Sequence, residues 1–296
     1  MEIKKAILPI GGVGTRFLPL SRVFPKELWP LVDIPLLQYI VREAKDSGVS
    51  QIIFAISPEK KIVFDYFVKA PNGFEPAKKI EKILSDRKKN STLQELKQLD
   101  DFLKGLSFSF VFQKKPLGDG HAILQAARMI SQESCAVLFG DDIVESQTPC
   151  LAQLSNIFKT CQKPVIALHR LPKEKLSSYG VVKTEKIANR LFKIKGIVEK
   201  PAIEQAPSDL AIVGKYILTP EVFEYLKKTP PDKGGEIRLA GAFDKMIKDG
   251  KVIYGYEFEG KWLECGNKTD WLKSNFYLAL KHPQYGPELR EFLKSF

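Results

Sequence analysis

A short apolar segment that runs directly into a glycine-rich loop constrains the fold of this chain more than any other feature. The segment covers residues 6–10, and the loop at residues 11–16 reads GGVGTR. An apolar run of this length that ends at glycines predicts a buried strand followed by a loop. Residues 36–48 then show helical spacing, and residues 51–56 form the next apolar run. The order strand, loop, helix, strand predicts an α/β fold with a parallel sheet and crossover helices.

The pattern of strands and helices changes near residue 172. Before this point, apolar runs alternate with helical segments, whereas short strand-like runs and then helices follow it. The later strands are predicted at residues 180–183, 195–198 and 211–218, and the later helices at 220–227, 236–248 and 269–280. No repeat, low-complexity tract or linker interrupts the 296 residues. We therefore expect one domain over 1–296, with halves at 1–172 and 173–296.

The chain is basic, with a formal net charge of +11 and an isoelectric point near 9.3. Such a balance suggests anionic partners, either nucleic acid or small substrates. The densest basic region, residues 78–104, interleaves its Lys and Arg with five acidic residues, which is typical of solvated helix faces. No clustered basic face with aromatic platforms is apparent, so we expect small anionic substrates and no nucleic acid.

The sequence shows no cysteine pattern, signal peptide or membrane span, and these three features together indicate the cellular compartment. Its four cysteines form neither a CxxC pair nor a recognisable zinc or disulfide pattern. Residues 1–10 are too short and too charged for a signal peptide, and no apolar run reaches the length of a membrane span. We therefore expect a cytoplasmic protein that has no membrane partner.

Two motifs near the N-terminus are suited to phosphate binding. The glycines within residues 11–14 let backbone amides approach an anion, and Arg16 adds a planar cation that matches phosphate oxygens. Lys26 follows ten residues later and can fold back onto a triphosphate. The spacing is neither that of a Walker loop nor that of GxGxxG. Taken singly, the loop could also be a plain turn, and Lys26 a surface lysine.

Two further motifs follow predicted strands. Asp141 and Asp142 end an apolar run at the sheet edge where α/β proteins bind ligands, and carboxylates there suit Mg²⁺. The alternative is that this pair caps the following turn. Glu199 and Lys200, in the segment GIVEKP, could hold a sugar hydroxyl and a phosphate, or could form an ion pair at a strand end.

Together these motifs, in this order, resemble the nucleotidyltransferases that make nucleoside diphosphate sugars. Among them they are most similar to the bacterial uridylyltransferases that act on glucose 1-phosphate. The resemblance runs nearly end to end. Further matching segments lie at residues 5–9, 18–19, 25–27, 38–39, 116–118, 120–123, 179–182, 198–201, 210–214, 228–230 and 265–268.

The resemblance implies a Rossmann-like nucleotide-diphospho-sugar transferase fold, in which helices flank a mixed, mostly parallel central sheet. It implies that residues 1–172 bind a nucleotide and residues 173–296 a sugar. The implied reaction transfers a uridylyl group from UTP to glucose 1-phosphate and yields UDP-glucose and pyrophosphate. It would proceed by Mg²⁺-assisted direct displacement at the α-phosphorus. A homo-oligomer, either a dimer or a tetramer, is also expected.

The resemblance assigns roles to individual residues. The catalytic cations would be Arg16, Lys26 and Lys200. The nucleotide would contact Gly11, Gly12, Gly14, Thr15, Gln113 and Gly118. The sugar phosphate would contact Gly180, Glu199, Lys200 and Gly214. Asp141 matches the Mg²⁺ ligand, and Glu264 is the candidate for a second metal contact. His121 is expected to be structural.

The chain departs from the family pattern at several positions. It has Ile34 where the family has Lys, and Glu264 where the family has Asp. Residues 234–241 read GGEIRLAG, where the family has GDEIQLTD. These departures leave a non-catalytic regulatory paralogue open. A thymidylyl- or cytidylyltransferase acting on a sugar 1-phosphate also stays open, because the choice of base depends on a few loop contacts that one sequence does not fix.

Overall fold

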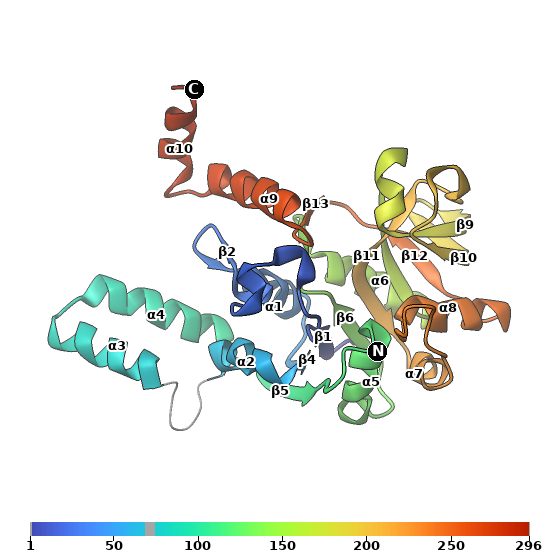
Figure 1. Cartoon of the computed structure of the whole chain (residues 1–296), viewed down its shortest axis with the longest axis horizontal. Helices are drawn as coiled ribbons and strands as arrows, with labels where there is room; N and C mark the ends of the chain where they lie inside the picture. The colour runs from blue at the N-terminus through green and yellow to red at the C-terminus, as the bar shows by residue number, and fades with distance from the viewer. Residues whose placement is uncertain (1, 69–74, 296) are drawn as a thin grey trace.

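The computed structural model describes residues 2–68 and 75–295, and the side chains of residues 75–78 lie outside that description. Over the described residues, a nine-stranded mixed sheet forms the centre of the molecule, with helices on both faces (Figure 1). The strand order is β5 (Ser107–Phe112), β4 (Gln51–Ile56), β1 (Lys5–Pro9), β6 (Cys135–Leu138), β11 (Leu210–Leu218), β8 (Val165–Arg170), β12 (Tyr254–Glu257), β10 (Leu191–Glu199) and β9 (Gly180–Ala188). The predicted α/β class is confirmed.

Strand direction divides the sheet into two parts. β5, β4, β1 and β6 run parallel, as the sequence predicts. Beyond β6 the pairing is mixed: β11 is antiparallel to β6 and β8, and β10 is antiparallel to β12 and β9, while β8 and β12 are parallel. The expectation of a mostly parallel sheet is therefore wrong for this part. One reason is local, because the tight turn at residues 189–190 joins β9 to β10, and such a turn connects only antiparallel strands.

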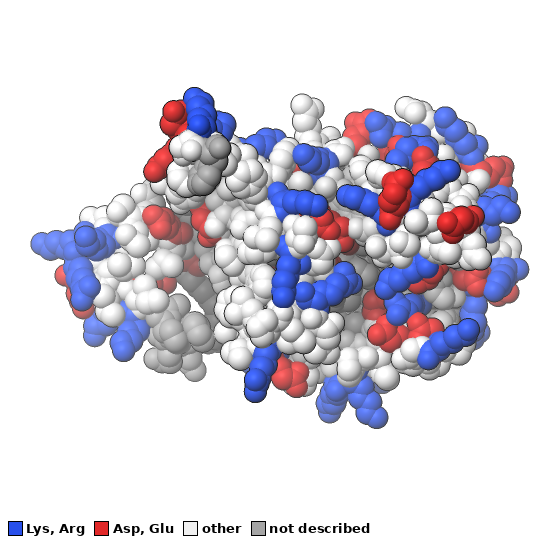
Figure 2. All heavy atoms as spheres, turned by 45° about the horizontal axis from the view of Figure 1, so that its top comes forward, with Lys and Arg blue, Asp and Glu red and all other residues white. Residues whose placement is uncertain are grey.

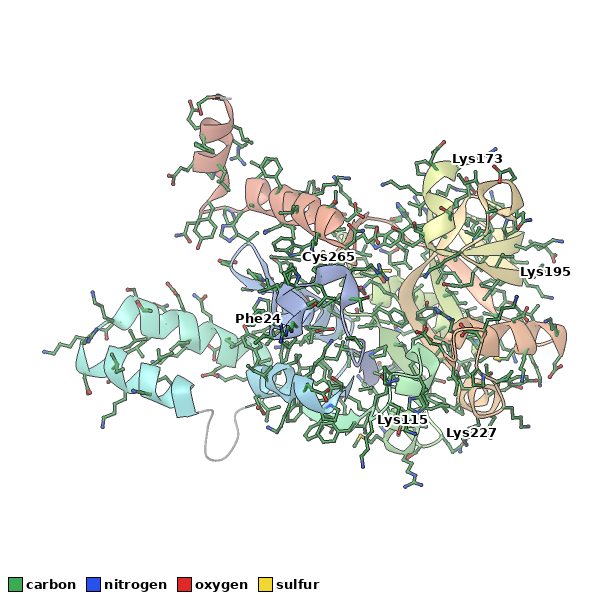
Figure 3. The ribbon with its side chains drawn as sticks, in the orientation of Figure 1. Phe24, Lys115, Lys173, Lys195, Lys227 and Cys265 are labelled. Carbon is green, nitrogen blue, oxygen red and sulfur yellow. The ribbon has the colours of Figure 1, made fainter. Side chains whose placement is uncertain are left out.

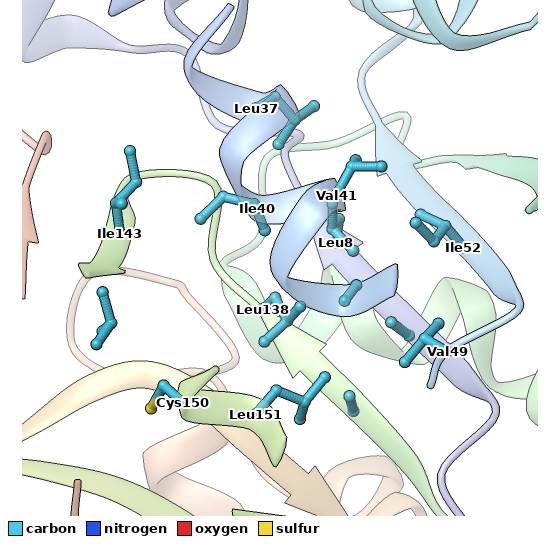
Figure 4. Close-up of a cluster of buried hydrophobic side chains, with 14 of the residues drawn as sticks. Leu8, Leu37, Ile40, Val41, Val49, Ile52, Leu138, Ile143, Cys150 and Leu151 are labelled. Atoms are coloured by element: carbon cyan, nitrogen blue, oxygen red, sulfur yellow. The ribbon is translucent and has the colours of Figure 1, made fainter. Parts of the chain in front are cut away.

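Both faces of the sheet are apolar, because successive side chains of a strand point to opposite sides. In β1, Leu8 belongs to the core beneath α1 (Leu36–Asp46) and α6 (Cys150–Cys161). Ile7 belongs to the core beneath α5 (Asp119–Ile130), α7 (Pro220–Lys227) and α8 (Leu239–Lys248). Figure 4 shows the first of these cores, where Leu8 lies against Ile40 and Val41 of α1. A further helix, α2 (Lys61–Phe67), also belongs to the body of the molecule.

Two pairs of helices extend from this body on different sides (Figure 1). They are α3 (Glu75–Asp86) with α4 (Asn90–Leu103), and α9 (Lys268–Lys281) with α10 (Gly286–Leu293). Two short ribbons complete the fold, namely β2 (Pro30–Leu31) with β3 (Ile34–Pro35), and β7 (Asp142–Glu145) with β13 (Lys261–Glu264). The second ribbon pairs Asp142 with Glu264 and so places two acidic residues just beyond the carboxyl end of β6.

Charged groups are dispersed over the surface. Figure 2 shows Lys and Arg mixed with Asp and Glu over the face in view. In Figure 3, Lys195 and Lys227 lie at the periphery, whereas Cys265 lies near the centre. Among the helices of the described segments, none has both the length and the apolar character needed to cross a membrane.

Candidate active site

A cavity of about 690 Å³ opens beside the start of β9 and the end of β10, and the middle of β11 also lines it. Seven of the residues to which the sequence analysis assigned a role line it. They are Arg16, Asp141, Gly180, Glu199, Lys200, Gly214 and Glu264. The fold thus brings the two halves of the chain together at one site.

The remaining predicted positions are not in the lining of this cavity, and several of them form a second group. Gln113 is buried, and its Nε2 donates to Gly118 O at 2.8 Å. A Cβ atom on Gly11 would collide with Gln113 Oε1. At Gly118, φ is +94° and a Cβ would lie 2.6 Å from Ile237 O, so only glycine fits there. His121 lies beside Gln113, with Nδ1 3.1 Å from Gln113 Nε2.

The glycine-rich loop continues into a short 3₁₀ turn, η1 (Thr15–Phe17). Gly14 precedes it in the left-handed conformation, with φ of 71°, and its carbonyl accepts a hydrogen bond from the Ser21 hydroxyl at 2.8 Å. Arg16, within the turn, donates to Gly266 O at 3.1 Å. The loop is thereby tied across the chain to the segment that follows β13.

Lys26 connects the glycine-rich part of the chain to Asp141. Its Nζ lies 2.5 Å from Asp141 Oδ2 in a mostly enclosed ion pair. Burial would raise the pKa of Asp141, but Lys26 and Arg16 hold it below its ordinary value, so the carboxylate is ionised at neutral pH. The predicted phosphate-binding lysine and the predicted metal ligand are therefore direct neighbours.

A second carboxylate, that of Glu264, lies close to Asp141. Gly266 has no side chain, and a Cβ placed there would lie 3.4 Å from Asp141 Oδ2 and 3.3 Å from Glu264 Oε1. Two carboxylates thus border one small space, which the Arg16 guanidinium shares, since its Nη1 would lie 3.1 Å from the same Cβ. Carboxylate oxygens are ligands that Mg²⁺ prefers. Over the described residues, no cluster of three or more His, Cys, Asp or Glu could hold a metal. A cation at Asp141 would therefore need phosphate oxygens or water for its other ligands.

Glu264 also contacts the residue that precedes β9. Its carboxylate accepts a short hydrogen bond from the Tyr179 hydroxyl. Burial raises the pKa of Glu264, while the bond from Tyr179 opposes that shift. Because Tyr179 directly precedes β9, this contact ties the acidic ribbon to the strand that begins at Gly180.

Asp142 is a site residue to which the sequence analysis gave no separate role. Its Oδ2 accepts from the Gly214 amide at 3.1 Å, and its Oδ1 accepts from Trp262 Nε1 at 2.9 Å. Burial and the neighbouring Asp141 raise its pKa to about 7. A Cβ on Gly214 would lie 2.6 Å from Phe139 Cβ, so glycine is needed for this close approach. The signal in the sequence was the doubled aspartate after a buried strand.

The pairing of β9 with β10 places Gly180 beside Glu199, and a Cβ on Gly180 would lie 3.0 Å from Glu199 Oε2. Lys200 follows in the left-handed region, with φ of 47°, and its amide donates to Tyr179 O at 3.0 Å. Lys200, which has this conformation that is unusual for a lysine, lines the cavity. Strained backbone conformations of this kind are often found at functional sites.

Arg238 is the second residue that the sequence analysis did not assign. It lines the cavity, and its guanidinium lies 3.9 Å from Glu199, 2.6 Å from Asp232 and 2.7 Å from Glu236. Arg238 belongs to the segment 234–241, which departs from the family pattern. That departure was the one feature of the sequence that could have pointed to Arg238. Ala240 of the same segment also lines the cavity.

Comparison with known proteins shows where this chain belongs. The family model described as nucleotidyl transferase matches residues 5–279. UTP–glucose-1-phosphate uridylyltransferase 1 of Staphylococcus saprophyticus is 39% identical over 295 residues, which cover 100% of this chain and 99% of that protein. The corresponding protein of Staphylococcus haemolyticus is 39% identical over 294 residues, or 99% of this chain and 98% of that protein.

Solved structures agree with the sequence relatives. A UDP-glucose pyrophosphorylase complexed with UDP-glucose has a TM-score of 0.83 at 35% identity, covering 95% of this chain and 100% of the other. A UTP-bound UGPase from Acinetobacter baumannii has a TM-score of 0.88 at 33% identity, covering 98% of each chain. The chain therefore belongs to the nucleotidyl transferase family, among relatives named UTP–glucose-1-phosphate uridylyltransferases.

Proposed function

We propose that this protein transfers a uridylyl group from UTP to glucose 1-phosphate and releases pyrophosphate, giving UDP-glucose. The observation that carries the proposal is similarity over the full length to proteins named for this reaction. The site supports it, because Arg16 and Lys200 come from the two halves of the chain and line one cavity with Asp141. Lys26 pairs with Asp141. Arg16 and Lys26 lie on the side of the glycine-rich loop, and Lys200 lies beside Glu199.

In the proposed reaction, a phosphate oxygen of glucose 1-phosphate attacks the α-phosphorus of UTP, and pyrophosphate leaves. The attacking oxygen is already anionic, so no general base is required. The protein must hold two polyanions in line and offset their charge. Arg16 and Lys26, together with the amides of Gly11, Gly12, Gly14 and Thr15, would hold the triphosphate. Lys200 would hold the sugar phosphate, while Gly180, Glu199 and Gly214 would contact the sugar.

We propose Mg²⁺ as the cofactor, with Asp141 as its main protein ligand and Glu264 as a second contact. When bound, the ion would offset phosphate charge and favour departure of pyrophosphate. Asp141 is suited to this role because its pKa lies below the ordinary value and it stays ionised. Lys26 would move its ammonium from Asp141 to a phosphate oxygen.

The orientation of Gln113 bears on the choice of base. Its Nε2 donates to Gly118 O, which leaves Oε1 as the atom that faces Gly11. An acceptor at this position would match the N3–H group of uracil or thymine, but not the unprotonated N3 of cytosine. Gln113 and Gly118 thus favour UTP over CTP and keep a thymidylyltransferase as the second candidate.

We also propose a Rossmann-like nucleotide-binding half within a single domain, a homo-oligomer, and a cytoplasmic location. The parallel strands β5, β4, β1 and β6 support the first, and the sheet shared by both halves supports the single domain. Exposed apolar side chains on α9 and α10, such as Phe276 and Phe292, support an oligomer. Four free cysteines support a reducing compartment.

A pyrophosphate-release assay tests the function. Purified protein with Mg²⁺ is given each of UTP, dTTP, CTP and ATP against several sugar 1-phosphates. We expect the highest kcat/KM with UTP and glucose 1-phosphate. A preference for dTTP would replace the uridylyl assignment with the thymidylyl one. Absence of turnover with every pair would favour the non-catalytic regulatory paralogue.

A further inference from the structure

A buried ion pair lies beneath the glycine-rich loop and outside the cavity. Lys60 ends the short turn η4 (Pro58–Lys60) after β4, and Glu27 lies in the turn η3 (Lys26–Leu28). Lys60 Nζ is 2.7 Å from Glu27 Oε1, and the two side chains are 10% and 2% exposed. Removing two charges from water is expensive, and an apolar pair of similar volume often serves stability as well or better. Burial of this pair is thus weak evidence for stability by itself, and its contacts with neighbouring segments show what it could position.

Lys60 also fixes the peptide that opens the glycine-rich loop. Its Nζ donates to Ile10 O at 3.0 Å in the interior. The carbonyl of Ile10 and the amide of Gly11 belong to one planar peptide group and, in the trans form, point in opposite directions. Holding the carbonyl toward Lys60 therefore turns the Gly11 amide away from the interior. That is the orientation a phosphate-binding loop requires.

Glu27 also lies in the turn that holds Lys26 and contacts the turn that precedes Asp141, the other two segments proposed to bind the triphosphate. It is the chain neighbour of Lys26, whose Nζ pairs with Asp141 Oδ2 at 2.5 Å. Its stem packs under the turn that precedes Asp141, since a Cβ on Gly140 would lie 3.7 Å from Glu27 Cγ and 3.2 Å from Ile10 Cγ2. Glu27 Oε2 is buried and accepts no hydrogen bond from the described residues.

We propose that Lys60 and Glu27 are positioning residues of the nucleotide site. Together they hold the Gly11 amide, the Lys26 turn and the Asp141 turn in one arrangement, although neither side chain lines the cavity. This inference rests on the proposed function, because it assumes that these three segments bind UTP. It extends that function to two residues that act through their neighbours.

The test measures UTP affinity by calorimetric titration with Mg²⁺, alongside KM, kcat and thermal unfolding. Lys60→Met alone leaves a buried carboxylate without a partner and should lower Tm. The informative variant is therefore the double Lys60→Met/Glu27→Gln, which removes both charges and keeps the side-chain volumes similar. We expect it to fold and to bind UTP about tenfold more weakly, while KM for glucose 1-phosphate changes less than about twofold.

A matched control comes from a second buried ion pair, Lys215 with Glu43, whose Nζ and Oε2 also lie 2.7 Å apart. Lys215→Met/Glu43→Gln should alter Tm but leave UTP affinity unchanged. Lys60→Arg, which keeps the charge, should restore part of the UTP affinity lost in the double variant. A double variant at positions 60 and 27 that folds and binds UTP as the wild type does would overturn the positioning role. Equal losses for both substrates would overturn it too. Wild-type protein that binds no UTP would overturn the proposed function itself, and this inference with it.

Discussion

The Nζ atom of Lys26 lies 2.5 Å from Oδ2 of Asp141, so a residue proposed for the triphosphate and one proposed for the metal neutralise each other. Burial would lower the pKa of Lys26 and raise that of Asp141, but their pairing reverses both shifts. Both groups therefore stay charged at neutral pH. A metal ion at Asp141 must displace Lys26, and a phosphate at Lys26 must leave Asp141 free. Metal and nucleotide should thus bind more tightly together than separately.

The first prediction tests this competition with Mn²⁺ alone. Lys26→Met removes the cation that occupies Asp141, so the variant should bind Mn²⁺ without nucleotide about tenfold more tightly than the wild type. Electron paramagnetic resonance of free Mn²⁺ at pH 8 measures this affinity. The variant should also lose UTP affinity, because a phosphate partner is gone. Lys61→Met, which removes an exposed lysine paired with Asp65, is the control. Unchanged Mn²⁺ affinity in Lys26→Met would show that the ion pair does not oppose the metal.

The second prediction concerns Asp141 in turnover. Asp141→Asn keeps the size of the side chain but removes the charge that would hold Mg²⁺. We expect kcat to fall by about 10²-fold or more, in line with the loss of a main electrostatic contact in the transition state. Asp209→Asn, at a surface aspartate paired with Arg170, should leave kcat unchanged. Near-normal activity of Asp141→Asn at limiting Mg²⁺ would show that another residue is the main ligand.

Sequence reasoning could locate most segments of the site because strand ends are visible in the sequence. The apolar run before Asp141 and the glycines after the first strand each predict the end of a strand. Parallel strands bring such ends to one edge, and β1 and β6 are indeed parallel neighbours. The proximity of Arg16 and Asp141 at the cavity could therefore be anticipated.

The contacts between distant segments could not be anticipated in the same way. Periodicity tells which face of a strand is apolar, but it does not give the order of the strands. The antiparallel insertion of β11 beside β6 places the Gly214 amide on Asp142, and no local pattern predicts that pairing. The approach of Lys60 to Glu27 likewise depends on how two turns meet.

The third prediction concerns the reactivity of the thiols. Burial raises the pKa of Cys135 and Cys150, and it raises that of Cys265 to about 12, so almost no thiolate forms at pH 8. Cys161 is only partly buried, although its pKa is also raised. The native protein should therefore show one slowly reacting thiol in an Ellman assay, and the denatured protein four. Cys161→Ser should abolish the native signal. Two or more thiols reacting at one rate would contradict the buried positions.

The fourth prediction concerns the division of roles between cations. Arg16 is the last residue of the glycine-rich loop, whereas Lys200 directly follows Glu199 at the end of β10. Arg16→Ala should therefore weaken UTP more than glucose 1-phosphate, and Lys200→Ala should do the reverse. Both should lower kcat, because charge builds up as pyrophosphate departs. Separate titrations of the two substrates measure the effects. If both variants lost both substrates equally, the cations would be acting only as a general positive field, which added salt would screen.

The last prediction concerns Arg238, which holds the segment 234–241 against the sugar side of the cavity. Its guanidinium bridges Asp232 and Glu236 and lies 3.9 Å from Glu199, so a neutral side chain would leave three carboxylates without their shared cation. Arg238→Gln should therefore raise KM for glucose 1-phosphate by about three- to tenfold and leave KM for UTP unchanged.

Arg238→Lys should lie between the wild type and Arg238→Gln, because an ammonium lacks the planar fork that lets an arginine engage two carboxylates together. Arg190→Gln is the matched control, since Arg190 is 35% exposed against 33% for Arg238, pairs with Glu259, and is not part of the cavity lining. It should leave both KM values unchanged. Steady-state kinetics with each substrate varied in turn decide the matter. A rise in KM for UTP as large as that for glucose 1-phosphate would mean that Arg238 supports the whole site and has no particular role at its sugar side.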